Sequence, residues 1–240
     1  MTEKAGKNED MARKLRFLFF ADSEKVFTFA QFFAKGNSKQ DINAKTRKTM
    51  LEKTNVKTID QVVVRFSGDS GDGMQLAGNI FSNVSAGVGD QISTFPDYPA
   101  EVRAPQGSLS GVSGFQVHVG RNVHTPGDQV DVLVSMNPAA LKQNVKFLKQ
   151  GGVAIVDSDL FTEKDLEKAL ITARGEEVYT ELGINPKQVV EVPMTTMVKE
   201  ALKDSGMDVK SVLKCKNMFA LGLICWLFDR PVENAVAKLQ

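Results

Sequence analysis

The residues with the clearest capacity for chemistry form a glycine-rich loop. Gly68, Gly71 and Gly73 lie within the stretch VVVRFSGDSGDGMQLAGNIFS, between a β-branched run and a helical pattern. Glycine permits a positive φ and lets a ligand approach the backbone without a Cβ in the way. A helix that starts directly after such a loop turns free N–H groups and its positive dipole end toward it. A phosphate or pyrophosphate is therefore the ligand that the loop favours.

The spacing of the glycines leaves two interpretations open. The pattern G-x-x-G-x-G differs from the dinucleotide fingerprint because Ser70 stands where the middle glycine should be, and no P-loop lysine follows. Asp69 and Asp72 would repel a phosphate if they pointed into the site. By spacing alone, phosphate binding and a tight structural turn are equally supported.

The elements that must position this loop have the pattern of an α/β domain. From Gln61 onward, short β-branched runs alternate with helical periods. The run QVVVRF predicts a strand before the loop. The helix after it should start near Gly73, because apolar residues then recur at three- and four-residue spacing. These residues are Leu76, Ala77, Ile80, Phe81 and Val84.

Five further stretches predict strands. QISTFPDY is one, ended by its prolines, and GFQVHVG alternates at period two, which predicts one wetter face. VDVLVSM is a continuous apolar run suited to burial on both sides, and QVVEVPM is a shorter one. GGVAIVDSD is the fifth, and its glycine pair is expected to end the preceding helix.

Capping residues indicate where the other helices begin. Asn137 with Pro138 predicts a helix start, and Thr162 or the neighbouring acids predict another. Thr195 or Thr196 is expected to cap the helix MVKEALKDSG, and KNMFALGLICWLF predicts a buried helix. Strands that alternate with helices predict a three-layer α/β/α fold, Rossmann-like, with a largely parallel or mixed sheet.

Length and composition narrow the class of protein. The chain has 240 residues, 42% of them hydrophobic, which suits one main domain. A net charge of +1 supplies no field that would draw nucleic acid or an acidic membrane surface, and no apolar run approaches the ~20 residues of a membrane span. Cys215 and Cys225 alone do not make a disulfide framework, so we expect a cytoplasmic protein.

Residues 1–58 differ in texture from the rest, with crowded phenylalanines and lysine-rich flanks. A partner-binding amphipathic helix would explain them, but the poor periodicity favours an N-terminal extension, disordered or read from a misassigned start codon. The domain itself is predicted over residues 59–240.

Four blocks of sequence resemble the γ domain of the 2-oxoacid:ferredoxin oxidoreductases, in the form that begins the α subunit of a 2-oxoglutarate-type enzyme. The similarity runs from Val62 to about Ala237. The blocks are FSGDSGDGMQLAGNIF, PAEVRAPQGSLSGVSGFQVHVG, DVLVSMNPAALKQNVKFLKQGGVAIVDSD and KNMFALGLICWLFDRPVE. Ser70 and Ala104 depart from frequent glycines of the family.

The resemblance implies a role in binding coenzyme A. Thiamine diphosphate, magnesium and [4Fe–4S] clusters would belong to partner domains, namely the thiamine-binding remainder of the α subunit and the β subunit, with ferredoxin as electron acceptor. Two cysteines cannot ligate a four-cysteine cluster. The chain is then a truncated α subunit or a separate γ-type subunit. The site residues implied are Gly68, Ser70, Gly71, Asp72, Gly73, Met74, Glu101 and Arg103.

Two other functions remain in competition with this interpretation. A stand-alone nucleotide- or CoA-binding regulatory module would use the same loop. An NAD(P)-dependent dehydrogenase would need an acidic residue at the end of the second strand, where Asp97, between two prolines, is a poor candidate. Asp157 and Asp159 end a buried strand, where ligands bind in α/β sheets, but turn-forming aspartates are equally common there.

Overall fold

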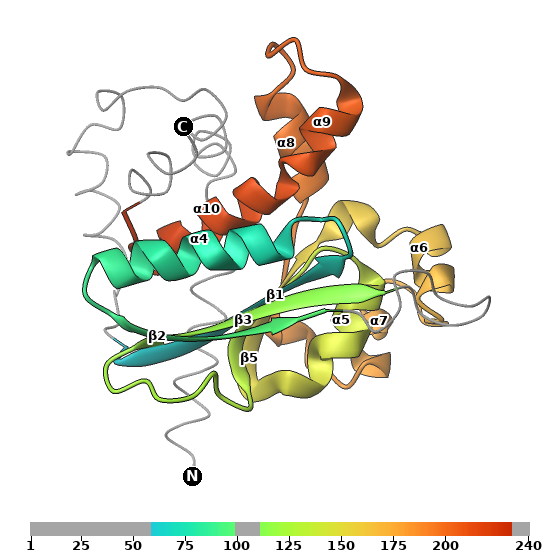
Figure 1. The fold of residues 1–240 in the computed structure, drawn as a ribbon. Coiled ribbons are helices and arrows are strands. Elements are labelled where there is room, and N and C mark those ends of the chain that lie inside the picture. Colours follow the sequence, from blue (N-terminus) through green and yellow to red (C-terminus); the bar gives the residue numbers. More distant parts are fainter. Residues whose placement is uncertain (1–58, 99–110, 232–240) are drawn as a thin grey trace, which may run out of the picture.

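A computed structural model describes residues 59–98 and 111–231 (Figure 1). In these ranges the chain forms a six-stranded sheet in the order β2-β3-β1-β4-β5-β6. The strands are β1 Gln61–Asp69, β2 Gln91–Asp97, β3 Val112–Gly120, β4 Val130–Ser135, β5 Leu148–Asp157 and β6 Val189–Val192. The helices are α4 Met74–Gly87, α5 Pro138–Asn144, α6 Glu163–Lys168, α7 Glu177–Glu181, α8 Met194–Ala201, α9 Val209–Lys214 and α10 Lys216–Leu227.

The sheet is mixed, and a single strand of it runs against the others. β1, β4, β5 and β6 pair in parallel, whereas β3 is antiparallel to both of its neighbours, β1 and β2. Helices cover both faces of the sheet, with α4 and α10 on one side and α5 to α7 on the other (Figure 1). The predicted three-layer α/β/α fold with a mixed sheet is confirmed.

Alternation along the central strand builds a separate core on each face. In β1, Val64 and Phe66 point to the α4 and α10 side, where they meet Phe81 and Leu221. Val63 points to the opposite side, into a second cluster with the residues of α5 to α7. The centre of the sheet is thus shielded from solvent on both faces.

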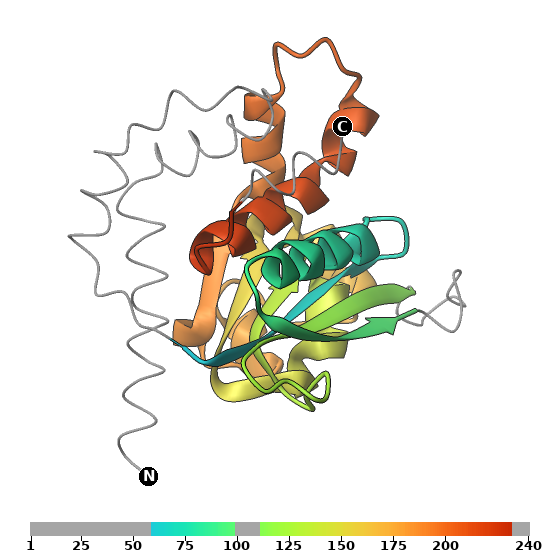
Figure 2. The ribbon, with the colours of Figure 1, turned by 60° about the vertical axis from the view of Figure 1, so that its left-hand side comes forward.

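α10 is apolar on every side because it is enclosed. It packs on α4 and meets α8, and its residues Phe219 to Cys225 are buried. α8 and α9 extend beyond α10, away from the sheet, as a pair of short helices (Figure 2). The prediction of a buried helix in this stretch is confirmed, as are the cap of α5 by Asn137 and that of α6 by Thr162.

The prediction for the glycine pair Gly151 and Gly152 was wrong. α5 ends at Asn144 and a 3₁₀ turn follows, so both glycines lie inside β5. A Cβ at Gly152 would sit 3.0 Å from the carbonyl oxygen of Asp131, at an irregularity in the pairing of β4 and β5. Glycine is needed here because the two backbones approach closely. Glycine is therefore as typical of a strand irregularity as of a helix end.

The predicted cap of α8 was also wrong. The helix starts at Met194, so Thr195 and Thr196 lie in its first turn. Their hydroxyl groups donate to Asp157 and Asp159, over 2.7 and 3.0 Å respectively. The two threonines therefore join α8 to the end of β5 instead of capping their own helix.

The wetter face expected for β3 is largely covered. Gln116 is only 4% exposed, because the segment after the strand folds beneath it. Its amide nitrogen donates to the carbonyl oxygens of Pro126 and Gly127, at 2.9 and 2.5 Å. His118 alone on this strand is half-buried. β2 continues through Pro96 to Asp97, which an edge strand tolerates.

Candidate functional site

The glycine-rich loop joins the end of β1 to the start of α4. Gly71 has φ +105° and Gly73 has φ +75°, in the left-handed region that side chains rarely adopt. Gly73 is the residue directly before the helix, so its conformation aims the first turn of α4. The free N–H groups of that turn point toward the loop, as the sequence predicts.

Gly68 has a different role from the other two glycines. A Cβ on Gly68 would lie 2.8 Å from one carboxylate oxygen of Asp72. That same oxygen, Oδ2, accepts a hydrogen bond of 2.9 Å from the backbone N–H of Asp69. The Asp72 carboxylate is thus turned back onto the loop's own backbone, and its burial raises its pKa above the ordinary value.

Three contacts from distant parts of the chain hold the loop. The Asn137 amide donates to Asp69 over 2.8 Å, and the N–H of Ser70 donates to the carbonyl of Gly111 over 3.2 Å. The amide of Asn217, at the start of α10, lies 3.4 Å from the carbonyl oxygen of Gly73. A Cβ on Gly73 would come within 2.2 Å of that amide nitrogen, so glycine is required here by packing as well as by φ.

A cavity of about 400 Å³ opens beside the loop, at the carboxyl ends of β1, β4, β5 and β6. This is the edge of an α/β sheet at which ligands bind. Its lining combines loop backbone, apolar side chains and three lysines. The lining residues are Gly71, Asp72, Met136, Leu160, Thr195, Lys199, Leu213, Lys214 and Lys216.

Asp157 is a fully buried carboxylate behind the wall of this cavity. It accepts hydrogen bonds from the N–H and hydroxyl of Thr195, at 3.3 and 2.7 Å. The ammonium group of Lys216 lies 3.4 Å from the same carboxylate, and the Lys216 side chain is itself only 12% exposed. A buried charge needs such partners, because desolvation of an isolated carboxylate is costly.

The structure brings six of the eight predicted site residues together in the loop, but their side chains have different surroundings. Gly71 and Asp72 line the cavity, and Ser70 is exposed beside them. Met74 is 1% exposed, with its side chain in the core, so only its backbone faces the loop. Glu101 and Arg103 lie outside the described residues.

Sequence reasoning missed the residues that helices α8 to α10 contribute. Lys199, Lys214 and Lys216 look like ordinary solvated lysines in the sequence, and Thr195 looks like a helix cap. Asn217 offered one signal, since it is a polar residue at the start of an otherwise apolar helix and is 7% exposed.

The described residues offer few other candidates for a functional site. No group of three or more His, Cys, Asp or Glu residues in ranges 59–98 and 111–231 could hold a metal ion. No helix in the same ranges is long and apolar enough to span a membrane. Cys215 and Cys225 are not in a disulfide bond. The glycine loop and its cavity remain the principal candidate.

Fold and site together define an α/β domain with a glycine-rich loop and a cavity at the carboxyl ends of its parallel strands. Residues 63–240 match the pyruvate ferredoxin/flavodoxin oxidoreductase family, and the chain belongs to that family. The resemblance found in the sequence is thereby confirmed.

Curated relatives place the chain within this family. It is 45% identical over 184 residues to the 2-oxoglutarate oxidoreductase subunit KorA of Mycobacterium tuberculosis, a match that covers 76% of this chain and 28% of the relative. It is 28% identical over 125 residues to the common γ subunit of the pyruvate/ketoisovalerate oxidoreductases of Thermococcus kodakarensis, covering 48% of this chain and 65% of that subunit. The chain thus spans little more than a quarter of the KorA subunit.

One solved structure supports the fold. The 2-oxoglutarate:ferredoxin oxidoreductase of Magnetococcus marinus, solved with 2-oxoglutarate, coenzyme A and succinyl-CoA bound, aligns with a TM-score of 0.53 at 22% identity. The alignment covers 74% of this chain and 26% of that one.

Proposed function

We propose that residues 59–240 are the γ-domain portion of a 2-oxoacid:ferredoxin oxidoreductase, with 2-oxoglutarate as the 2-oxoacid. The 45% identity to a 2-oxoglutarate oxidoreductase subunit supports this proposal, together with the family match. Residues 1–58 are then an N-terminal extension to the domain.

In the assembled enzyme, this domain helps to hold coenzyme A. The observation that carries the proposal is the loop itself, with Gly71 and Gly73 at positive φ, the start of α4 behind them and a cavity at their side. The backbone N–H groups of Gly71, Gly73 and Met74 can donate to phosphate oxygens, since those of Ser70 and Asp72 already donate to Gly111 and Asp69. The absence of a Cβ at Gly71 leaves room for the ligand. Coenzyme A in the Magnetococcus enzyme is consistent with this assignment.

The remaining predicted residues have supporting roles in the proposal. Arg103 supplies a positive charge to a CoA phosphate, and Glu101 belongs to the same proposed site. Asp72 shapes the loop by accepting a hydrogen bond from the N–H of Asp69. Its carboxylate occupies the space that a Cβ at position 68 would need, so that position requires glycine. Ser70 offers its hydroxyl at the exposed rim.

The other cofactors belong to partner chains or domains in this proposal. Thiamine diphosphate with magnesium supplies the decarboxylation chemistry, and [4Fe–4S] clusters carry electrons to ferredoxin, in the thiamine-binding remainder of the α subunit and in the β subunit. The two cysteines of this chain are too few for a four-cysteine cluster. This domain therefore binds and orients CoA and carries out no covalent step of the reaction. We place the complex in the cytoplasm.

Gly71→Ala tests the proposal in the assembled enzyme. A Cβ at Gly71 meets no atom within 4 Å, so it enters only the space that the ligand would use. We expect the KM for CoA to rise about tenfold, equivalent to about 1.4 kcal/mol, with the KM for the 2-oxoacid nearly unchanged.

Gly89→Ala is the matched control. Gly89 has φ +93°, close to the +105° of Gly71, and also has open space around its Cβ position, but it lies beyond the far end of α4. Both variants should carry similar backbone strain. If both leave the KM for CoA unaltered while losing similar stability, the loop is only a structural turn and the CoA assignment fails.

A further inference from the structure

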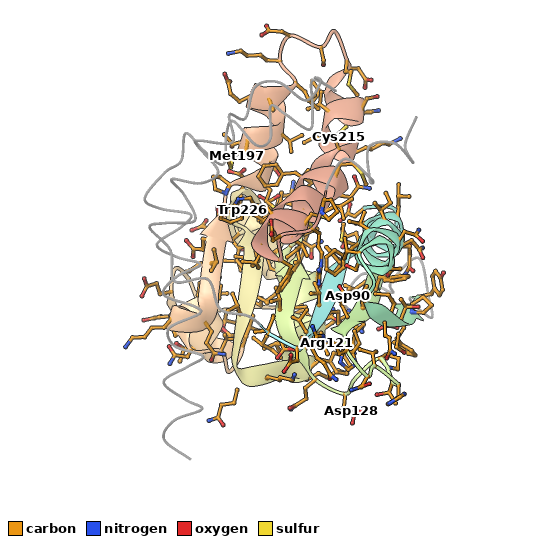
Figure 3. The ribbon with its side chains drawn as sticks, turned by 90° about the vertical axis from the view of Figure 1, so that its left-hand side faces the viewer. Asp90, Arg121, Asp128, Met197, Cys215 and Trp226 are labelled. Atoms are coloured by element: carbon orange, nitrogen blue, oxygen red, sulfur yellow. The ribbon has the colours of Figure 1, made fainter. Side chains whose placement is uncertain are left out.

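One wall of the cavity beside the glycine loop is cationic. Lys199 comes from the last turn of α8, Lys214 from the last turn of α9 and Lys216 from the start of α10. Figure 3 shows Met197 of α8 and Cys215, between α9 and α10, on these helices and well away from Asp128 at the opposite end of the sheet. Three helices thus bring lysines to one place.

The charges of two of these lysines are not compensated by neighbours. Lys216 pairs with the buried Asp157. Neither Lys199 nor Lys214 forms an ion pair with any residue in the described part of the chain. Two positive charges therefore remain available to an anion in the cavity.

The one carboxylate that lines the cavity opposes them weakly. Asp72 directs Oδ2 to the N–H of Asp69, within its own loop. The lining sets three lysines against this single carboxylate. The lining therefore has a net positive character.

The rest of the cavity suits a ligand with an apolar body. Met136, Leu160 and Leu213 provide apolar contact, and Gly71 contributes backbone without a side chain. A volume of about 400 Å³ lies in the range of small-molecule sites, roughly 300 to 1,000 Å³. Inorganic phosphate alone would leave most of it empty.

We propose that Lys199 and Lys214 bind the phosphates of the ligand held by the glycine loop, as the cationic side of a site for a diphosphate-bearing compound. This inference rests on the proposed function, because Gly71 and Asp72 line the same cavity. It adds contacts from α8 and α9, so that the ligand bridges the loop and the helical pair that extends from the sheet. Lys216 acts indirectly, by neutralising Asp157 behind the wall.

Binding measurements on the full 240-residue chain test the inference, with coenzyme A, inorganic pyrophosphate and phosphate-free pantetheine as probes. The double variant Lys199→Gln and Lys214→Gln should weaken CoA and pyrophosphate binding at least about tenfold, since each lysine supplies a charged hydrogen bond. Pantetheine binding should not change. Lys199→Gln and Lys214→Gln are also made singly. Lys187→Gln is their control for the loss of one surface charge, because Lys187 lies just before the amino end of β6 and the cavity lies at the carboxyl ends of the strands.

The outcomes separate this inference from the proposed function. CoA affinity that falls in Gly71→Ala but not in the double lysine variant would overturn the lysine assignment and leave the loop's role intact. Lysine-dependent pyrophosphate binding without any CoA binding would support the anion site and overturn the CoA assignment. Failure of the wild-type chain to bind either CoA or pyrophosphate would overturn the inference. Thermal melts check that each variant is folded.

Discussion

Two ionised side chains are buried on opposite faces of the sheet, Arg65 in β1 and Asp157 at the end of β5. Arg65 lies on the α5 to α7 side with Val63, and Asp157 lies on the α4 and α10 side with Ile155. Each has an oppositely charged partner. Their surroundings nevertheless serve different purposes.

The Arg65 network is closed in the sense that none of its members lines the cavity beside the glycine loop. Its Nε donates to Asn144 over 2.6 Å, a second nitrogen donates to Gln116 over 3.3 Å, and a third pairs with Asp97. The guanidinium also lies 4.7 Å from the ring centroid of Phe147. The Arg65 side chain is 2% exposed, and its contacts fasten the ends of β2 and α5 to the centre of the sheet. The Asp97 side chain at the end of β2 is 43% exposed.

The Asp157 network opens onto the cavity beside the glycine loop. Its two partners, Thr195 and Lys216, both line that cavity. Under the proposed function, a change in this network alters the charge in the cavity, whereas a change at Arg65 alters the packing of the fold. The two networks therefore differ in position, because the partners of Asp157 line the cavity for which we propose a ligand and those of Arg65 do not.

The largest expected effect is at the closed network. Arg65→Met should lower the free energy of unfolding by about 3 kcal/mol, because Asn144 and Gln116 lose a buried donor and Asp97 loses its partner. Urea denaturation measures this loss. Lys146→Met is the control, since Lys146 lies 5.0 Å from the same Phe147 ring, and it should cost below about 1 kcal/mol. Equal losses in the two variants would show that the ring contact, not the network, matters.

A smaller and divided effect is expected at the open network. Asp157→Asn retains the shape of the side chain but leaves Lys216 without its counter-charge, so stability should fall by about 2 kcal/mol. Pyrophosphate should bind more tightly, because the cavity gains a net positive charge. Urea denaturation measures the loss of stability, and calorimetry on the same samples measures the affinity for pyrophosphate. A simultaneous fall in affinity would mean that Asp157 is a purely structural residue, as Arg65 is.

The smallest expected effect is a pH-dependent one in the loop. Because burial raises the pKa of Asp72, the folded chain holds its proton to higher pH than the unfolded chain does. Stability therefore falls as pH rises from the ordinary carboxyl pKa, about 4, through the raised folded value. Asp72→Asn should remove that loss, so the thermal midpoint of the variant should gain on the wild type between pH 4.5 and 7. A difference that stays constant over this range would contradict the assignment.

Several elements were predictable because their signals are local. β1, the glycine loop and α4 follow from a β-branched run, turn residues and a helical period in adjacent sequence. Asn137 was predictable as a cap because its side chain bonds the N–H of Ala140, three residues away. These contacts close within a few residues, so neighbouring letters suffice to indicate them.

The errors arose where one residue type serves two kinds of contact. A glycine pair suits a helix end or a strand irregularity, and the choice at Gly152 depends on Asp131 in the neighbouring strand. A threonine before a helical pattern suits a cap, but Thr195 bonds Asp157 from another element, 38 residues away. The alternation in β3 predicted a solvated face at Gln116, but the segment with Pro126 and Gly127 covers that face.

The glycine loop, its position between a strand and a helix, and the family resemblance can all be recognised in the amino-acid sequence, because they depend on residues that are close in the chain. The surroundings of the loop depend instead on how distant helices pack. Asn217 meets Gly73 across 144 residues, and Lys199 and Lys214 reach the cavity because α10 packs on α4 and carries α8 and α9 with it. A lysine at the end of a short helix has the same local pattern wherever that helix packs, so its partner is decided by the burial of apolar faces and not by the residues beside it.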